Sequence, residues 1–469
     1  MNRGEHPVTT PSVTGEFEAF FERHPDTQML EVLTPDMNGI FRGRRILHSE
    51  WRSLQAGGLK ASMSQALVTT TGNYRDEVDA RLAGGEPDRT LVSVPGSLVP
   101  VPWLASPTAQ VMAGLCDAQG RPCWSDPRQV LARVVERLRY AGLFPVVATE
   151  LEFYLLAPGQ ATHPRALLSS VGALSGEQAG DRAAAIEDLW EHDSFISEVH
   201  AACDAQNVPL IAIQRESSAG QWEINTRHVD DPVLACDHAL LLKRIVKGVA
   251  FRHGIAATFM AKPFADADGS GLHVHTSLRD AQGRNLLLGA GPADALSGMS
   301  GTLQYAVGGL LDSMPEAMAI FAPNANSYRR FVPGTCVPLS PSWGYNHRDV
   351  SVRLPVSGGD SFRLEHRVAG ADANPYLVVA AVLAGMLRGI EAQQSPGPML
   401  REASALPDQG ERLPARWERA LDLAAASQWL PTVLGENYCN AFLTMRRVEC
   451  DAFHRQIPDI DYAWYLRAV

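Results

Sequence analysis

The sequence predicts an α+β protein with a small N-terminal domain and a larger second domain that begins near residue 121. The first observation is length, because 469 residues exceed what one hydrophobic core normally organises. The second is composition, since 45% hydrophobic and 20% charged residues are typical of a globular protein. The third is that strand-like runs with a two-residue period alternate with helical patterns along the chain.

The N-terminal domain is predicted over residues 17–120. Residues 1–16 are polar, rich in Thr, Pro, Ser and Gly, and are expected to form a disordered tail. Three phenylalanines at helical spacing predict a short helix from Gly15 to Arg23. Two further elements are expected, a hairpin over 29–47 that turns at Asp36-Met-Asn-Gly39 and a strand-like run over 88–104.

The second domain is predicted over residues 121–469 and opens with a helix. Asp126 suits the N-cap position and Pro127 the first turn, and apolar residues then keep a helical period to Tyr140. The downstream patterns predict strands at 145–156, 207–213, 219–226, 255–262 and 271–279, helices at 180–205, 231–253, 296–317 and 374–392, and a mostly helical segment at 413–469.

Charge, hydropathy and cysteine usage exclude several classes of protein. The net charge of −11 argues against a nucleic-acid partner, which needs a basic surface. No apolar run reaches the ~18 residues of a membrane span, and the N-terminus lacks the apolar stretch of a secretory signal. The seven cysteines form no Cys-x-x-Cys pair. We therefore expect no disulfide framework, no structural zinc site and a cytoplasmic location.

Two glutamates, Glu150 and Glu152, lie two residues apart in an apolar strand-like run. The two-residue period of a strand puts both carboxylates on one face. Burying them is costly unless they meet cations, and divalent cations take several oxygen ligands. The alternative is a solvated strand face with two surface glutamates.

Glu216 and Glu223 flank a Ser-Ser-Ala-Gly-Gln-Trp segment. Their spacing of seven would put them on opposite faces of a continuous strand. A bend at Ala219-Gly220 could bring both to one site, because glycine permits the necessary backbone angles. A surface turn is the alternative interpretation.

His273 and His275 also share a strand face, directly after the glycine loop Gly269-Ser-Gly-Leu. Imidazole can ligate a metal or donate to a phosphate oxygen, and the glycines allow a close approach to a substrate. A structural or solvent-facing histidine pair is the alternative.

Six arginines between residues 329 and 367 alternate with Val, Leu and Phe. Guanidinium groups suit carboxylate and phosphate oxygens and stabilise charge on a transferring phosphoryl group. A solvated basic stripe is the alternative, but the apolar neighbours favour partly buried strands. Together with the carboxylates and histidines, these arginines predict a two-metal phosphoryl-transfer site.

In this order the motifs resemble those of one family, the glutamine synthetases, from about residue 17 to the C-terminus. Stretches such as Ser-Trp-Gly at 342–344 look most like the γ-glutamylpolyamine (γ-glutamylputrescine) synthetase branch. The motifs are Asp36-x-x-Gly39, Glu150-x-Glu152, Glu216 with Gly-Gln-x-Glu223, Lys262-Pro263, Gly-Ser-Gly-x-His273-x-His275, Asn326-Ser-Tyr-x-Arg330-x-x-Pro-Gly, Arg348 with Arg353-x-Pro, Glu365-x-Arg367 and Asn374-Pro-Tyr-Leu.

The resemblance implies an N-terminal β-grasp domain, a catalytic α/β domain and a homo-oligomer, usually a dodecamer of two stacked hexamers. A neighbouring subunit would complete each site and contribute Asp36. ATP would be the co-substrate, with two or more Mg²⁺ or Mn²⁺ ions per site.

The resemblance also implies roles for individual residues. One metal would be held by Glu152, Glu216 and Glu223, and the other by Glu150, His273 and Glu365. Glutamate would be bound by Arg330, Arg367 and the backbone of Gly269. ATP would be bound by His275, Ser277, Arg348, Arg353 and Arg363. The catalytic residues would be Arg330, Arg348 and Asp36.

Two positions depart from the glutamine synthetase pattern. The glutamate expected after Pro333-Gly334, which helps to bind and deprotonate ammonium and to close the site, is replaced by Cys336. A neutral thiol cannot hold an ammonium cation as a carboxylate can. Asp268 replaces the usual asparagine of the glycine loop. The tyrosine-bearing segment of adenylylated enzymes is absent around 390–410, so that form of regulation is not expected.

These features predict an ATP-dependent ligase that joins the γ-carboxylate of glutamate to a primary amine through γ-glutamyl phosphate. Putrescine or another polyamine is the favoured amine. The alternatives are an ammonium-using glutamine synthetase, a ligase for monoamines or ethanolamine, and an inactive regulator or structural ring. Cys336 argues against ammonium, and the presence of all six candidate metal ligands argues against an inactive protein.

Overall fold

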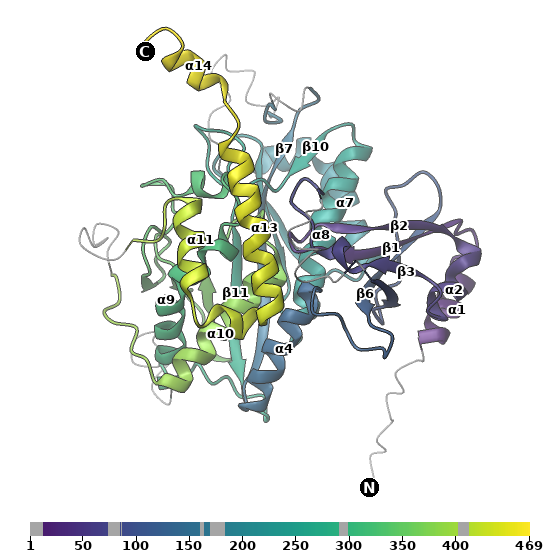
Figure 1. The fold of residues 1–469 in the computed structure, drawn as a ribbon, viewed down its shortest axis with the longest axis horizontal. Coiled ribbons are helices and arrows are strands. Elements are labelled where there is room, and N and C mark those ends of the chain that lie inside the picture. The colour runs from purple at the N-terminus through teal and green to yellow at the C-terminus, as the bar shows by residue number, and fades with distance from the viewer. Residues whose placement is uncertain are drawn as a thin grey trace.

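The computed structural model describes residues 13–73, 85, 87–159, 164–168, 183–289, 299–401 and 412–469. Two sheets and a layer of helices form an α+β fold, which confirms the predicted class (Figure 1). Most of the predicted disordered tail lies outside the described residues, and the first helix, α1, already begins at Val13.

The N-terminal sheet has six strands in the order β2-β1-β6-β4-β3, with β5 paired to β6. Its strands β1 and β2 form the predicted hairpin, in which Gly39 adopts the positive φ of +71° at the turn. Phe17 and Phe20 of α1 pack with Trp51 against the sheet, as expected for a β-grasp domain. The elements are α1 (Val13–Arg23), β1 (Met29–Pro35), β2 (Phe41–Leu47), α2 (Trp51–Gln55), β3 (Lys60–Ser62), β4 (Asp88–Ser93), β5 (Val99–Pro100) and β6 (Thr108–Cys116).

The central strand β6 is absent from the sequence prediction. It pairs in parallel with β1 and antiparallel with β4 and β5. Eight of its nine residues are buried, so the run shows no alternation of polar and apolar residues. The predicted run at 88–104 is two strands, β4 and β5, because the chain turns at Gly96, where φ is +77°.

The second sheet has eight strands in the order β12-β13-β14-β11-β7-β9-β8, with β10 paired to β7. The longest strand, β7, lies between β11 and β9 and pairs antiparallel with both. The predicted strand at 255–262 contains only the short β10. The strands are β7 (Phe144–Leu156), β8 (Leu210–Arg215), β9 (Gln221–Thr226), β10 (Ala256–Thr258), β11 (Leu272–Arg279), β12 (Trp343–Tyr345), β13 (Val352–Leu354) and β14 (Leu364–His366).

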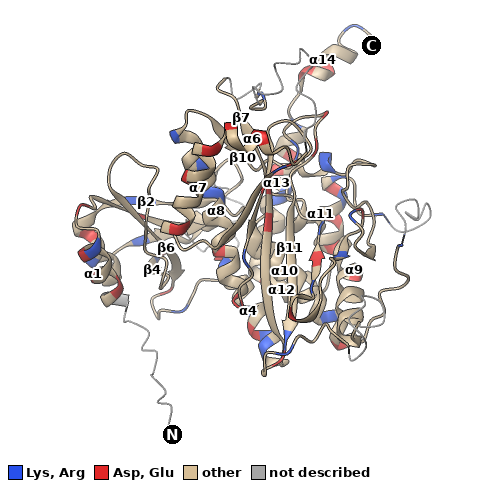
Figure 2. Ribbon diagram, turned by 180° about the vertical axis from the view of Figure 1, so that it is seen from behind, with Lys and Arg blue, Asp and Glu red and all other residues tan. Residues whose placement is uncertain are grey.

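Helices gather on one side of the second sheet, and α9, α10, α11 and α13 lie together in front of it (Figure 1). Seen from behind, the strands stand in front of these helices (Figure 2). The predicted helix at 180–205 is two helices that meet at His192, and residues 180–182 lie outside the described residues. The helices are α4 (Pro127–Tyr140), α6 (Ile186–Glu191), α7 (Asp193–Ala205), α8 (Pro232–Arg252), α9 (Gly301–Phe321), α10 (Pro375–Ala392), α11 (Trp417–Ala426), α12 (Leu430–Leu434), α13 (Glu436–His454) and α14 (Asp459–Tyr465).

Helix α10 is the one helix of the described chain that is long and apolar enough to span a membrane, and 78% of it is buried inside the fold. It packs against α9, α4 and α8, so its apolar surface belongs to the core. Asn374 caps its N-terminus, accepting from the Tyr376 backbone N–H. The Asn374 amide also donates to the backbone oxygens of Asp36 and Met37, 3.2 Å from each. The hairpin turn of the N-terminal sheet is thereby attached to the helical core.

Candidate active site

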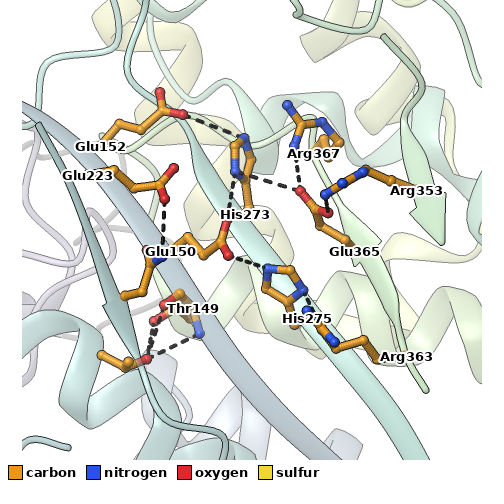
Figure 3. A network of polar contacts seen from close by, with 12 residues as sticks. Thr149, Glu150, Glu152, Glu223, His273, His275, Arg353, Arg363, Glu365 and Arg367 are labelled. Carbon is orange, nitrogen blue, oxygen red and sulfur yellow. Dashed lines mark hydrogen bonds and ion pairs between the residues drawn. The ribbon is translucent and has the colours of Figure 1, made fainter. Parts of the chain in front are cut away.

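The site forms on one face of the second sheet, around the middle of β7 (Figure 3). Glu150 lies opposite His273 of β11 on one side of the strand, and Glu152 lies opposite Glu223 of β9 on the other. Because side chains alternate along a strand, Glu150 and Glu152 share a face, as their spacing predicts. The sheet therefore brings together acidic groups and an imidazole from three separate segments.

Glu216 and Glu223 meet through a turn between two strands, where the sequence suggested a bend within one. Strand β8 ends at Arg215, the chain turns with Gly220 at a φ of +76°, and β9 runs back antiparallel. The Gln214 amide nitrogen donates to Glu216 Oε1 at 3.1 Å and to Glu223 Oε1 at 3.0 Å. The turn therefore places both carboxylates at one site despite their odd spacing.

Two cavities adjoin on this face of the sheet. A cavity of about 600 Å³, here called the carboxylate cavity, is lined by eleven predicted residues: Glu150, Glu152, Glu216, Glu223, Gly269, His273, Arg330, Arg348, Arg353, Glu365 and Arg367. A second cavity of about 300 Å³, here called the His275 cavity, is lined by the predicted residues His275, Ser277 and Arg363. Glu150 and Asn225 line both cavities, so the two spaces meet at these side chains.

Glu150 is the carboxylate that both histidines contact. Its Oε1 lies 2.9 Å from His275 Nε2, and its Oε2 lies 3.3 Å from His273 Nδ1. Burial opposes ionisation, but hydrogen bonds from the two histidines hold the pKa of Glu150 well below its usual range. Arg363 Nε contacts the other ring nitrogen of His275 at 3.0 Å, which fixes the orientation of that ring.

Glu365 is paired with two arginines. Arg353 Nη1 lies 2.8 Å from Glu365 Oε2, and Arg367 Nη1 contacts Oε1. Burial favours the neutral acid, but His273, His275 and Arg367 lower the pKa of Glu365 to about 2. Arg367 Nε also donates to the backbone oxygen of Arg348 at 3.0 Å, so the guanidinium groups are held in place at the cavity wall.

The opposite wall carries carboxylates without such compensation. Burial, then the neighbouring Glu150, Glu152 and Glu216, raise the pKa of Glu223 to about 8. Burial and Glu152 also raise the pKa of Glu216. Nearby positive charge would stabilise the ionised form of these crowded carboxylates. Divalent cations, which prefer several oxygen ligands, fit this donor set.

The described residues contain two compact groups of possible ligand atoms here, each within 4.8 Å of one another. Glu150 forms one with His275 and Glu365, and the other with Glu223 and His273. The resemblance groups these residues differently, with His273 beside Glu365 and with Glu216 as a ligand. His273 Nδ1 does lie 3.8 Å from Glu365 Oε1. The residues fit metal ions, and their division into the two sets that the resemblance implies stays a prediction.

Arg330 and Gly269 form the far wall of the carboxylate cavity. Arg330 is 3% exposed and donates from Nη1 to the Val368 backbone oxygen at 3.1 Å. Burial lowers the pKa of Arg330, and its Nε has no hydrogen-bond partner within the described chain. A Cβ atom added at Gly269 would lie 2.5 Å from Arg330 Cγ. Glycine therefore lets the loop and the arginine approach one another.

Cys336 borders the same cavity with Gly334, Thr335 and Val337. It is exposed and adopts a positive φ of +53°, a conformation that disfavours bulky side chains. Partial burial of the sulfur and the neighbouring Asp349 raise the pKa of the Cys336 thiol. The position therefore presents a neutral thiol with an acidic side chain close behind it.

Asp36 is the one predicted site residue that lines neither cavity. Its carboxylate is fully buried in its own turn, where Oδ1 accepts from the Asn38 and Ile40 backbone N–H groups. Arg42 Nε donates to its Oδ2 at 2.9 Å. Burial nevertheless raises the pKa of Asp36. These contacts stabilise the turn, and the role of Asp36 in the site of a neighbouring subunit stays a prediction.

Among the cavity residues to which the sequence analysis gave no role are Gln221 and Asn225. Both flank Glu223 at two-residue spacing in β9 and line the carboxylate cavity. The Asn225 amide donates to Glu223 Oε1 at 3.1 Å, while its own Oδ1 is buried and has no hydrogen-bond partner among the described residues. Strand alternation from Glu223 would have identified both, because all three share one face.

Known proteins resemble this chain along nearly its whole length. A family model described as glutamine synthetase, catalytic domain, matches residues 124–465. The chain is 37% identical over 454 residues to gamma-glutamylputrescine synthetase of Escherichia coli (strain K12), covering 97% of this chain and 95% of that protein. It is 29% identical over 457 residues to a glutamate–isopropylamine ligase of a Pseudomonas species, covering 95% and 96%. A solved structure of GmaS in complex with ADP matches with a TM-score of 0.83 at 26% identity, covering 98% of this chain and all 100% of that one.

Proposed function

Because the chain belongs to the glutamine synthetase family, we propose that it is an ATP-dependent ligase that joins the γ-carboxylate of glutamate to a primary amine, with putrescine favoured. The match to the glutamine synthetase catalytic domain supports the assignment as a ligase. The names of two similar proteins, a γ-glutamylputrescine synthetase and a glutamate–isopropylamine ligase, support an organic amine over ammonium. The protein would act in polyamine metabolism. Monoamines and ethanolamine are the alternative substrates, and a γ-glutamylethanolamide synthetase of Streptomyces coelicolor is also similar, at 30% identity.

The two adjoining cavities suggest where each substrate binds. Glutamate would lie in the carboxylate cavity, with its α-carboxylate near Arg330 and the Gly269 loop. Arg330 Nε, which has no partner in the described chain, suits that anion. ATP would occupy the His275 cavity and meet Arg363 and Ser277. The reacting γ-carboxylate and γ-phosphoryl group would then meet near Glu150, where the cavities join.

The reaction would proceed in two balanced steps. A γ-carboxylate oxygen attacks the γ-phosphorus, the bond to ADP breaks, and γ-glutamyl phosphate forms. The amine nitrogen then attacks the acyl carbon, phosphate leaves, and one N–H proton is released. Arg367 and Arg353, held by Glu365 at the cavity wall, are placed to stabilise charge on the phosphoryl oxygens.

Two or more Mg²⁺ or Mn²⁺ ions are proposed as cofactors, held by Glu150, Glu152, Glu216, Glu223, His273 and Glu365. When bound, such ions neutralise phosphate charge and polarise the transferring group. The proposal is supported by the raised pKa values of Glu216 and Glu223, whose crowded carboxylates a cation would stabilise.

The amine would enter beside Cys336. A neutral thiol there leaves room for an alkyl chain, whose methylenes gain about 0.8 kcal/mol each on burial. Asp349 lies close enough to the Cys336 thiol to hydrogen-bond with it, and its carboxylate, which is outside the lining of the cavity itself, could pair with the distal ammonium of a diamine. We therefore propose Asp349 as the residue that distinguishes putrescine from a monoamine of the same length.

We also propose that residues 17–120 and 121–469 are separate domains, that the protein is a homo-oligomer, of the dodecameric type, and that it acts in the cytoplasm. The domain boundary falls between β6 and α4. The location is supported by the similarity to soluble metabolic enzymes.

The test is an amine panel scored by phosphate release with glutamate, ATP and Mg²⁺. Putrescine should give a much higher kcat/KM than ammonium, and a higher one than butylamine. If ammonium gives the same kcat/KM as the organic amines, the protein is a glutamine synthetase in which Cys336 replaces the usual glutamate. A preference for butylamine would keep the ligase class and reject the polyamine assignment.

Two variants test which residues determine the choice of amine. Cys336→Glu should shift preference toward ammonium, because it restores a carboxylate at the position of the amine. Asp349→Asn should raise the KM for putrescine about tenfold or more while leaving the KM for butylamine unchanged, since only the diamine has a second charge. Equal effects on both amines would exclude Asp349 as the specificity residue.

A further inference from the structure

A second group of metal-ligating side chains lies far from the carboxylate cavity, between two C-terminal helices. Cys450 and His454 are four residues apart on α13, so they share one face of that helix. Glu418 faces them from the first turn of α11. One ligand atom from each residue lies within 4.8 Å of the other two, and none of the three lines either active-site cavity.

The spacing suits a tetrahedral ion with little adjustment. Zinc–ligand distances of about 2.0–2.3 Å require ligand atoms roughly 3.3–3.8 Å apart. Glu418 Oε1 and His454 Nε2 lie 2.7 Å apart, so they would need to separate by about an ångström. Both side chains are about half exposed, at 47% and 51%, which leaves them free to do so. Cys450 is 2% exposed and closes the inner side of the group.

The ligand types favour a thiophilic transition metal. Thiolate and imidazole select ions such as Zn²⁺ over Mg²⁺, which prefers oxygen alone. A thiolate and a carboxylate together would balance a divalent charge. Without a metal, burial and then Glu418 and Asp451 raise the pKa of Cys450 to about 11. The thiol is therefore protonated at neutral pH, and a metal would have to displace its proton.

We propose that Glu418, Cys450 and His454 bind one Zn²⁺-type ion, with water in the fourth position, at a site separate from the ligase centre. Such an ion would fasten α11 to the end of α13. The preceding turn of α13 carries Arg446, which contacts Asn38, and Glu449, which contacts Thr70. The ion would thus brace the helix that holds the N-terminal domain in place.

The test uses the full-length, metal-free protein with Co²⁺ as a spectroscopic probe. Thiolate-bound Co²⁺ gives an intense near-ultraviolet charge-transfer band, which oxygen and nitrogen ligands alone do not produce. Wild type should develop this band at one equivalent of Co²⁺ per chain, and Zn²⁺ should abolish it. Mg²⁺ in excess should leave the band unchanged.

Matched variants identify the ligands. Cys450→Ser should lose the band, while Cys336→Ser, which removes the exposed thiol of the carboxylate cavity, should keep it. His454→Gln should weaken Co²⁺ binding at least about tenfold, whereas His200→Gln, at an exposed histidine with its own acidic neighbour, should not. Because His454 is exposed, its variant tests the site even if Cys450→Ser misfolds.

Absence of the band in folded wild type would overturn the proposal. So would its loss in Cys336→Ser together with retention in Cys450→Ser, which would locate the thiolate at the ligase centre. Mg²⁺-dependent ligation should be unchanged in His454→Gln, since no substrate site includes that residue.

Discussion

Glu152 on β7 lies directly opposite Glu223 on β9, so two carboxylates occupy one rung of an antiparallel pair. Like charges facing each other destabilise a sheet. Here burial, Glu150, Glu152 and Glu216 together raise the pKa of Glu223 to about 8. The metal-free fold therefore carries a local electrostatic cost that a bound cation would relieve, and the cost can be measured.

Glu223→Gln should stabilise the metal-free protein while reducing ligation severely. The amide keeps the shape of the side chain and removes its charge, so the free energy of unfolding in EDTA should rise by about 1 kcal/mol, the scale of one pKa unit. Denaturant unfolding with EDTA measures the gain. With Mg²⁺ the order should reverse, because the wild type gains binding energy that the variant has lost.

The same pair predicts a pH dependence. The fold raises the pKa of Glu223 above its ordinary value of 4.5. Its contribution to stability is therefore fully present below about pH 4.5 and is lost as the pH rises toward 8. In EDTA, wild-type stability relative to Glu223→Gln should fall across this window. A relative stability that rises with pH would show that Glu223 is compensated by a group not identified here.

Glu216→Ala should abolish ligation and leave the assembly intact, as should Glu152→Ala. Metal charge stabilisation supplies several kcal/mol in sites of this type. Turnover at saturating Mg²⁺ and the size of the assembly by light scattering are the measurements. Glu198→Ala, at a partly exposed glutamate on α7 that contacts Arg252, is the matched control. Retention of more than roughly a tenth of wild-type turnover would refute the ligand assignment, because a tenfold loss is only about 1.4 kcal/mol.

Arg330→Lys should lower kcat more than it raises the KM for glutamate. The planar guanidinium of Arg330 can donate two hydrogen bonds to oxygens whose charge increases during phosphoryl transfer. A lysine ammonium cannot reproduce that geometry. Steady-state kinetics at saturating ATP separate the two effects. Arg329→Lys, at the exposed neighbouring position, should change neither constant. A change confined to KM would indicate uniform binding of substrate and transition state.

Asp36→Asn distinguishes a structural from a catalytic role for the turn. Loss of the buried charge pairing with Arg42 should lower the free energy of unfolding by about 1–3 kcal/mol. If the role is structural alone, turnover of the folded fraction should stay within about threefold of wild type, a change below 1 kcal/mol. Asp88→Asn, at an exposed strand start, is the control. A hundredfold loss of turnover without a change in stability would support the role of Asp36 in the site of a neighbouring subunit.

Much of the fold could be predicted from short-range patterns in the sequence. The hairpin β1–β2, the capped helices α4 and α10, and the strands β7 and β11 all carry strong short-range signals, such as Asp126-Pro127 and Asn374-Pro375. Strand β6 could not be read, because burial on both faces removes the polar alternation that marks a strand. The break between β4 and β5 depends on a single turn at Gly96.

The sequence by itself determined the residue types of the site, their order and the family, because these are properties of short motifs. Only the tertiary structure decided which of them meet. Period-two spacing predicts that Glu150 and Glu152 share a face, but strand pairing alone puts Glu223 opposite Glu152 and His273 opposite Glu150. It also separates Asp36, whose hydrogen bonds are satisfied within its own turn, from the cavity. Register and burial are cooperative properties of the packed sheet, so no local pattern could specify them.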